Sequence, residues 1–165
     1  MKEIILCKYG EIVLKGANRG YFEDMLCREL RRRSSGYGHF DVHRSQSTIY
    51  IEPLDDDADL DGMYGAAGRV FGIIALTRAA VCEKNLDSIL ATAREYIPPF
   101  MEGIRTFKVE GKRADKAFPL NSMELSAEVG AAVLSACPRL RVDVHAPQLT
   151  VRVEIRETAA YIHAG

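Results

Sequence analysis

Hydrophobic and polar positions along the first third of the chain predict a strand, a helix and a hairpin. The apolar run 4–7 predicts a buried strand that ends in a turn at Gly10. After Asn18, which can serve as an N-cap, apolar residues recur at three- and four-residue spacings and predict a helix. Its expected buried face consists of Tyr21, Phe22, Met25, Leu26 and Leu30. Residues 39–44 and 48–52 then predict the two strands of a hairpin, so the chain opens as β-α-β-β.

The acidic run 55–59 separates this opening from the rest of the chain. Asp57 or Asp59 can cap a short helix that reaches about Gly68. The apolar and β-branched run 70–81 predicts a buried strand, and 86–97 predicts an amphipathic helix that the following prolines end. We therefore expect a soft domain boundary at the acidic run.

The last third of the chain predicts three strands around one long helix. Phe107 and Val109 alternate with charged residues, as in a half-exposed strand. Asn121 and Glu124 have capping-box spacing at the start of a helix that Pro138 closes. Strands at 149–155 and 160–163 follow. The expected fold class is α+β, with helices packed on one face of each sheet.

Composition and charge give little indication of a partner. The 22 Lys and Arg residues are balanced by 23 Asp and Glu, so any basic surface must be local. The four cysteines are far apart without metal-ligand spacing, which favours reduced thiols in a cytosolic protein. No signal sequence or apolar run near the roughly 18 residues of a membrane span is visible. We expect a cytoplasmic protein that does not contact membranes and binds no metal.

Sequence motifs for catalysis are missing. The chain has no Gly-rich phosphate loop of the Walker or Rossmann type and no nucleophile elbow. Its histidines are scattered singly, and its carboxylates lie in caps, acidic linkers or strand faces. We therefore predict no catalytic residue in these 165 residues.

The most informative feature is a basic segment that leads into the long helix. Residues 105–116 contain five cations against Glu110 and Asp115, and a helix start near Asn121 favours anions. Alternate positions of the strand at 149–155 could extend this patch through Arg152 and Arg156. A solvated basic loop beside a capped helix explains the same pattern. Phe118 is interpreted as a core residue in preference to a base-stacking one.

A second basic cluster surrounds the turn before the first helix. It also ends at a helix N-terminus, where backbone N–H groups favour an anion. Its members are Lys8, Tyr9, Lys15, Asn18 and Arg19. Structural roles for the neighbouring glycines and a capping role for Asn18 account for it as well.

The motifs themselves resemble one family. The string KYGEIVLKGANR at 8–19 resembles the opening signature of ThiI-type tRNA 4-thiouridine synthetases. FKVEGKRADKAFPL at 107–120 resembles the THUMP-domain signature of that family, and VRVEIRE at 151–157 also fits. The resemblance implies an N-terminal ferredoxin-like domain at 1–60, with a boundary that can extend to about 75, followed by a THUMP RNA-binding domain at 61–165.

The resemblance also implies a transfer-RNA partner, gripped at its acceptor stem and 3′ end. The THUMP residues it places at the RNA are Lys108, Lys112, Arg113, Lys116, Asn121 and Ser122, with Arg152 and Arg156 beside them. It places Lys8, Lys15 and Arg19 at the stem backbone. Ala17 departs from the pattern, because relatives often carry a basic residue there.

Relatives continue into a PP-loop domain that binds ATP and Mg and catalyses tRNA uracil 4-sulfur transfer. No SGGxDS-like motif occurs here, so we expect a truncated form that carries no cofactor and is non-catalytic alone. The resemblance further implies a cysteine desulfurase as sulfur donor for the parent, a role in thiamine thiazole synthesis in some members, and a homodimer formed through the missing domain.

Two other readings remain open. The THUMP domain could belong to another tRNA-modifying enzyme, a methyltransferase or a deaminase, although the string at 8–19 argues against this. A ferredoxin-like interaction or small-molecule domain would suit the near-zero net charge.

Overall fold

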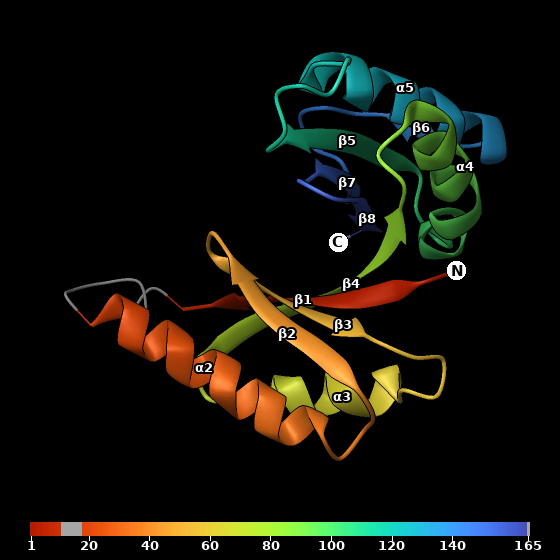
Figure 1. Ribbon diagram of the computed structural model, residues 1–165. Coiled ribbons are helices and arrows are strands. Elements are labelled where there is room, and N and C mark those ends of the chain that lie inside the picture. The colour runs from red at the N-terminus through yellow and green to blue at the C-terminus, as the bar shows by residue number, and fades with distance from the viewer. Residues whose placement is uncertain (11–17, 165) are drawn as a thin grey trace. The chain divides into compact units, whose positions relative to one another are not determined.

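The computed structural model describes residues 1–10 and 18–164. The chain divides into two compact units, one formed by Glu3–Arg78 and the other by Met1–Lys2 together with the residues from Ala79 onward. Strand β4 (Ile73–Cys82) runs from the first unit into the second. Figure 1 shows the elements of the chain. Each unit has its own hydrophobic core.

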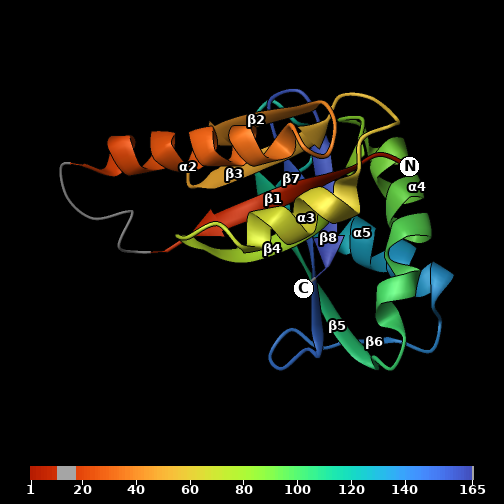
Figure 2. The same cartoon turned by 90° about the horizontal axis from the view of Figure 1, so that it is seen from below.

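The N-terminal unit is a sheet with two helices on one face. Its elements are β1 (Glu3–Tyr9), α2 (Arg19–Ser34), β2 (Phe40–Ser45), β3 (Thr48–Pro53), α3 (Leu60–Gly68) and the first part of β4. The strand order is β2-β3-β1-β4, and β3 pairs antiparallel with both β1 and β2. Figures 1 and 2 show α2 and α3 on the same side of this sheet. The predicted β-α-β-β opening is confirmed.

Helix α2 buries a different face from the one that its periodicity predicts. Tyr21 and Met25 are exposed, and the buried positions include Leu26, Cys27 and Leu30. A charged residue, Glu23, is buried on the same face. The predicted face is therefore wrong for the first turns of the helix, because polar partners on the sheet make a carboxylate the better residue to bury there.

One helix cap and one hairpin turn in this unit follow local rules. Asp59 caps α3 by accepting a 2.9 Å hydrogen bond from the Gly62 amide, as the sequence predicts. The β2–β3 hairpin closes through Gln46 and Ser47, and Gln46 has a positive φ of 56°. Helix α3 contributes Met63 and Ala67 to the N-terminal core.

The C-terminal unit consists of hydrogen-bonded strands with two helices packed against them. Its further elements are α4 (Leu86–Tyr96), a 3-10 turn η1 (Pro98–Met101), β5 (Thr106–Arg113), α5 (Ser122–Ala136), β6 (Arg141–Val142), β7 (Leu149–Ile155) and β8 (Ala160–Ala164). The strand order is β4-β8-β7-β5-β6, with β5 parallel to β6 and β7. The predicted strands at 149–155 and 160–163 and the helix at 86–97 are confirmed within a residue or two at their ends.

Helix α5 supplies the crossover that parallel strands require. Leu125, Val129 and Val133 face the core, as predicted, and pack with Phe107 and Phe118. Phe118 is thus a core residue. The adjoining charged positions of β5 project to the opposite side of the sheet, since successive side chains of a strand alternate.

The helices of the described ranges are all too short or too polar to cross a membrane.

Candidate nucleic-acid interface

Paired strands bring several predicted cations together on one face of the C-terminal sheet. Glu110 of β5 lies opposite Arg152 of β7, and Lys112 lies opposite Glu154. Glu110 accepts from Lys108 at 2.9 Å and lies 3.5 Å from Arg152 Nε. The hydrogen bond from Lys108 lowers the pKa of the Glu110 carboxyl, with further lowering by nearby charges. Glu110 therefore neutralises part of the positive charge that the sequence predicts for this face of the sheet.

Arg156 lies at the end of β7, beside the turn into β8. Its Nε is 3.7 Å from a carboxylate oxygen of Glu154, and its side chain is only 18% exposed. Arg152 is more accessible, at 39%. Of these two predicted contacts, Arg152 is therefore the better placed to reach a ligand.

Arg113, the last residue of β5, holds the loop 114–120 that connects β5 to α5. Its Nη1 donates to the carbonyl oxygens of Lys116 at 3.1 Å and Phe118 at 3.0 Å. This bonding leaves Lys116 exposed on a loop of defined shape. Arg113 thus shapes the loop that presents Lys116.

A second tie holds the same loop. Lys84 forms an ion pair with Asp115 and donates to the Glu157 carbonyl at 2.8 Å. The Asp115 carboxylate also accepts from the Ala117 amide at 3.0 Å. The hydrogen bond from Lys84 is the largest cause of a lowered pKa for Asp115. The loop before α5 is consequently anchored on both sides of Lys116.

The start of α5 carries the capping box that the sequence predicts. Asn121 accepts from the Glu124 amide at 2.8 Å, and Glu124 accepts from the Asn121 amide at 3.0 Å. Two main-chain donors at this helix start are therefore already bonded. An anion here would meet the amides of the next residues, Ser122 and Met123, together with side chains from the loop.

Gly111 lets α5 begin close against β5. A Cβ added there would lie 2.9 Å from the Ser122 carbonyl oxygen. The Gly111 amide donates to Ser126 Oγ at 2.9 Å, and that hydroxyl donates to Ser122 O at 2.7 Å. These contacts hold the predicted residues Lys112, Asn121 and Ser122 at one end of β5.

The N-terminal unit holds the other predicted cluster. Lys8 donates to the Thr48 hydroxyl, across the β1–β3 pair. Arg19, the first residue of α2, donates to Ser47 Oγ at 3.2 Å and lies 3.5 Å from Glu23. Lys15 and Ala17 lie outside the described residues.

Two further residues of this cluster, Glu23 and Arg44, were not predicted from the sequence as site residues. Arg44 on β2 donates to Glu23 Oε1 at 2.6 Å, and Tyr9 donates to Oε2 of the same carboxylate. The only available signal was a charged residue interrupting the apolar face of α2. Recognising Arg44 needed the β2–β3 register, which sets the face on which it lies.

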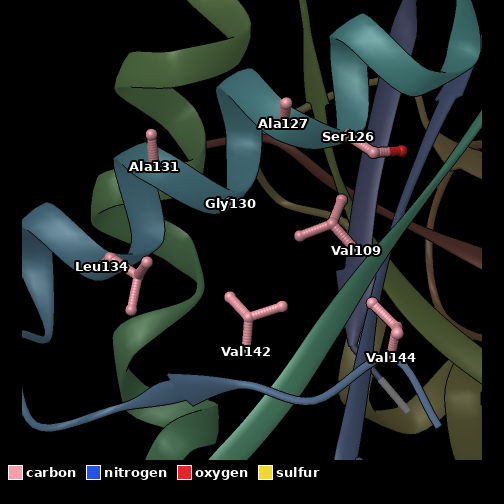
Figure 3. A pocket seen from close by; sticks show the side chains of 8 residues that line it. All are labelled: Val109, Ser126, Ala127, Gly130, Ala131, Leu134, Val142 and Val144. Carbon is pink, nitrogen blue, oxygen red and sulfur yellow. The ribbon is translucent and has the colours of Figure 1, made fainter.

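An apolar groove of about 340 Å³ lies elsewhere on the C-terminal unit, between α5 and the segment around β6 (Figure 3). Its walls include Val109 of β5, Leu134 of α5, and Val142 and Val144. Ser126 is the polar side chain of the lining. Such a lining does not suit phosphate, so the groove is not assigned to contacts with the RNA backbone.

Among residues 1–10 and 18–164, no three or more potential metal-ligand side chains lie close enough together to hold a metal ion. The described residues therefore contain no candidate metal site. Cys7, Cys27 and Cys82 are buried in the described structure. Burial raises the pKa of the Cys7 thiol to about 12 and that of Cys82 to about 11. These thiols are therefore poor nucleophiles.

Comparison with known proteins follows the same division of the chain. The profile of the ThiI ferredoxin-like domain matches residues 4–77, and that of the THUMP domain matches 83–164. A protein of Thermoanaerobacter sp. (strain X514) named "Probable tRNA sulfurtransferase" is 43% identical over all of this chain. A protein of the same name from Acetivibrio thermocellus is 38% identical over 95% of the chain. The chain spans 42% and 41% of the lengths of these two relatives.

Solved structures agree with this assignment. A 4-thiouridine synthetase in complex with RNA and ATP is 28% identical, with a TM-score of 0.81 over 100% of this chain and 41% of its own. A Pyrococcus horikoshii protein, PH1313, is 25% identical with a TM-score of 0.81 over 99% of this chain and 54% of its own. TrmN from Thermus thermophilus, at 21% identity and a TM-score of 0.66, shares the fold. The chain belongs to the ThiI-type proteins and consists of their ferredoxin-like domain followed by a THUMP domain.

Proposed function

We propose that this chain is the tRNA-binding region of an ATP-dependent tRNA uracil 4-sulfurtransferase, and that it holds the acceptor stem and 3′ end. The observation that carries the proposal is the cation-bearing loop fixed at the start of α5. Lys116 is exposed on this loop, which leads into the capped helix start, and Lys112 is exposed near the end of β5. The proposal is supported by relatives named tRNA sulfurtransferase and by the likeness to a synthetase solved with RNA.

The chemistry of the two basic regions, one at the start of α5 and one that includes Lys8 and Arg19, indicates which part of the tRNA each of them contacts. Lysine and arginine contacts to phosphate oxygens fix the position of an RNA without reading its sequence. An unpaired 3′ end adds base edges and 2′-hydroxyls that polar groups such as Asn121 and Ser122 can contact. We assign the loop and α5 start, with Lys108, Arg113, Arg152 and Arg156 around them, to the 3′ end. Lys8, Lys15 and Arg19 are assigned to the stem backbone.

Sulfur transfer itself is assigned to a part of the protein beyond this chain. A PP-loop domain would bind ATP and Mg and activate the uridine, and a cysteine desulfurase would supply the sulfur. The same sulfur could serve thiamine thiazole synthesis, and a homodimer could form through that domain. The proposed compartment is the cytoplasm, where tRNA is modified.

The test is binding of an acceptor-stem minihelix, measured by fluorescence anisotropy at several salt concentrations. We expect affinity to fall steeply with salt and to weaken when the unpaired 3′ overhang is removed. Lys112→Ala and Lys116→Ala should each weaken binding and lower the slope of log K against log salt by about 1.

Arg94→Ala, which removes an exposed cation from α4, is the matched control and should bind normally. Absence of minihelix binding at low salt would overturn the proposal. Equal binding with and without the overhang would remove the 3′ end from it.

A further inference from the structure

A buried carboxylate joins α2 to the β2–β3 hairpin in the N-terminal unit. Glu23 is 1% exposed. Its Oε1 accepts from Arg44 at 2.6 Å and lies 3.5 Å from Arg19 Nε, and its Oε2 accepts from the Tyr9 hydroxyl. Burial and this hydrogen bond raise the pKa of Tyr9 above its usual value, so the hydroxyl remains a donor. Three side chains from three different elements therefore meet at one carboxylate.

The side chains around this carboxylate carry more positive charge than is needed to pair it. Burying a carboxylate is costly unless it is paired and hydrogen-bonded. One arginine would suffice to pair Glu23, but two guanidinium groups share its Oε1. Both remain open to solvent, with side chains 46% exposed for Arg19 and 37% for Arg44. Asp24 lies 3.9 Å from Arg44 and is exposed, so it offsets this charge only weakly.

The neighbouring hairpin turn is held to the same cluster. Arg19 Nη2 donates to Ser47 Oγ at 3.2 Å, and the Tyr9 hydroxyl lies 3.4 Å from the Gln46 carbonyl oxygen. Gln46 has a φ of 56°, which is uncommon for a residue with a side chain. These contacts fix the positions of α2's first residue and β2's last arginine relative to each other.

We propose that Arg19 and Arg44 form one phosphate-binding pair for the tRNA stem backbone, and that Glu23 is the positioning residue that aligns them. Arginine suits this role because its planar fork keeps several N–H donors after one is used on a carboxylate. Because Glu23 already restricts both guanidinium groups, binding to neighbouring phosphate oxygens costs them little further side-chain freedom. The inference rests on the proposed function and adds Arg44 and Glu23 to its site.

A purely structural lock would use the same bonds but predicts different behaviour. In that case Arg44 would affect folding alone, and substitution would leave the salt dependence of RNA binding unchanged. A phosphate contact contributes to the salt slope, because each neutralised phosphate releases condensed counterions. The slope therefore separates the two roles.

The experiment measures minihelix affinity against salt for the protein and four variants. We expect Arg44→Ala to weaken binding about 10-fold and to lower the slope by about 1, and Arg19→Ala/Arg44→Ala to lower the slope by about 2. Arg44→Lys should keep the slope while losing part of the affinity, because it retains charge without the fork. Arg32→Ala is the control, since Arg32 is an exposed arginine of α2 that is also paired with a glutamate.

Stability is measured in parallel by urea unfolding, so that a folding defect in Arg44→Ala is detected. If that variant does not fold, the Arg44→Lys result decides, together with protection of Arg44 from phenylglyoxal by the minihelix. An unchanged slope in Arg44→Ala, or no protection of Arg44 by bound RNA, overturns the phosphate pair while wild-type binding persists. Loss of wild-type binding would instead refute the proposed function.

Discussion

The main-chain amide of Gly111, near the end of β5, donates a 2.9 Å hydrogen bond to the Ser126 hydroxyl on α5. Among the described residues, β5 has no strand partner on that side at this point, because the two-residue strand β6 pairs only with Thr106 and Phe107. A helix side chain therefore satisfies an edge amide of the sheet. This contact sets the place where α5 begins and thus where the predicted RNA contacts lie.

Replacing Gly111 by alanine should displace the start of α5. The added Cβ would lie 2.9 Å from the Ser122 carbonyl oxygen and 3.1 Å from Ser126 Oγ, and backbone cannot yield as a flexible side chain can. We expect the free energy of unfolding to fall by about 1–3 kcal/mol and minihelix affinity to fall with it. Urea unfolding and anisotropy measure the two effects.

Gly130→Ala on the same helix is the matched control. Its Cβ would come no closer than 3.9 Å to Val109 Cγ2. Alanine is better than glycine inside a helix by up to about 1 kcal/mol, so the variant should be neutral or more stable. A similar loss of stability in both variants would contradict the role given to Gly111.

The two predicted asparagine N-caps, Asn18 and Asn121, should differ in their contribution to stability. Asn121 makes both bonds of a capping box, whereas Asn18 makes no side-chain bond to α2. Asn121→Ala should lower the free energy of unfolding by about 1 kcal/mol, and Asn121→Ser should restore most of it. Asn18→Ala should leave it within about 0.5 kcal/mol of the original value. Equal losses in urea unfolding would refute this distinction.

Arg113 and Lys116 should give different mutant profiles although the sequence places both in one basic segment. Arg113 donates to two carbonyl oxygens of the loop, whereas Lys116 is exposed. Arg113→Ala should lower both the melting temperature and minihelix affinity. Lys116→Ala should lower affinity alone. Calorimetry with anisotropy checks this, and a normal melting temperature in Arg113→Ala would remove its scaffolding role.

The pairing of Asp115 with Lys84 predicts a stability difference that depends on pH. The folded-state pKa of Asp115 is lowered, so its contribution is fully present above the unfolded value near 3.8 and is lost as pH falls through the folded pKa. Asp115→Asn should therefore be less stable than the original protein at neutral pH, with the difference shrinking below about pH 4.

Urea unfolding between pH 7 and pH 2.5 measures this difference. Asp57→Asn, which alters an exposed carboxylate of the acidic run, is the comparison. A difference for Asp115→Asn that persists unchanged at the lowest pH would show that the lost bonds are not those of the ionised carboxylate.

Local patterns determined much of this fold. The capping box at Asn121, the cap at Asp59 and the alternation along 149–155 all depend on residues within a few positions of one another. Such features are set by backbone hydrogen bonding and side-chain periodicity, so they can be predicted from the chain alone. The motif resemblance added the order of the two domains.

Tertiary structure decided which residues of each candidate site are engaged and with what. Glu110 offsets Arg152 only because β5 and β7 lie in a particular register. Glu23 is buried, against the apolar periodicity of α2, because β1 and β2 bring Tyr9 and Arg44 to it.

By itself, the sequence determined the elements, their caps and the basic character of two segments. Only the tertiary structure decided that Glu23 is buried and that Arg44 lies beside Arg19 at its carboxylate. The physical reason is that the interactions of a charged side chain depend on burial and on partners far away in the chain, and strand register and helix placement bring these together.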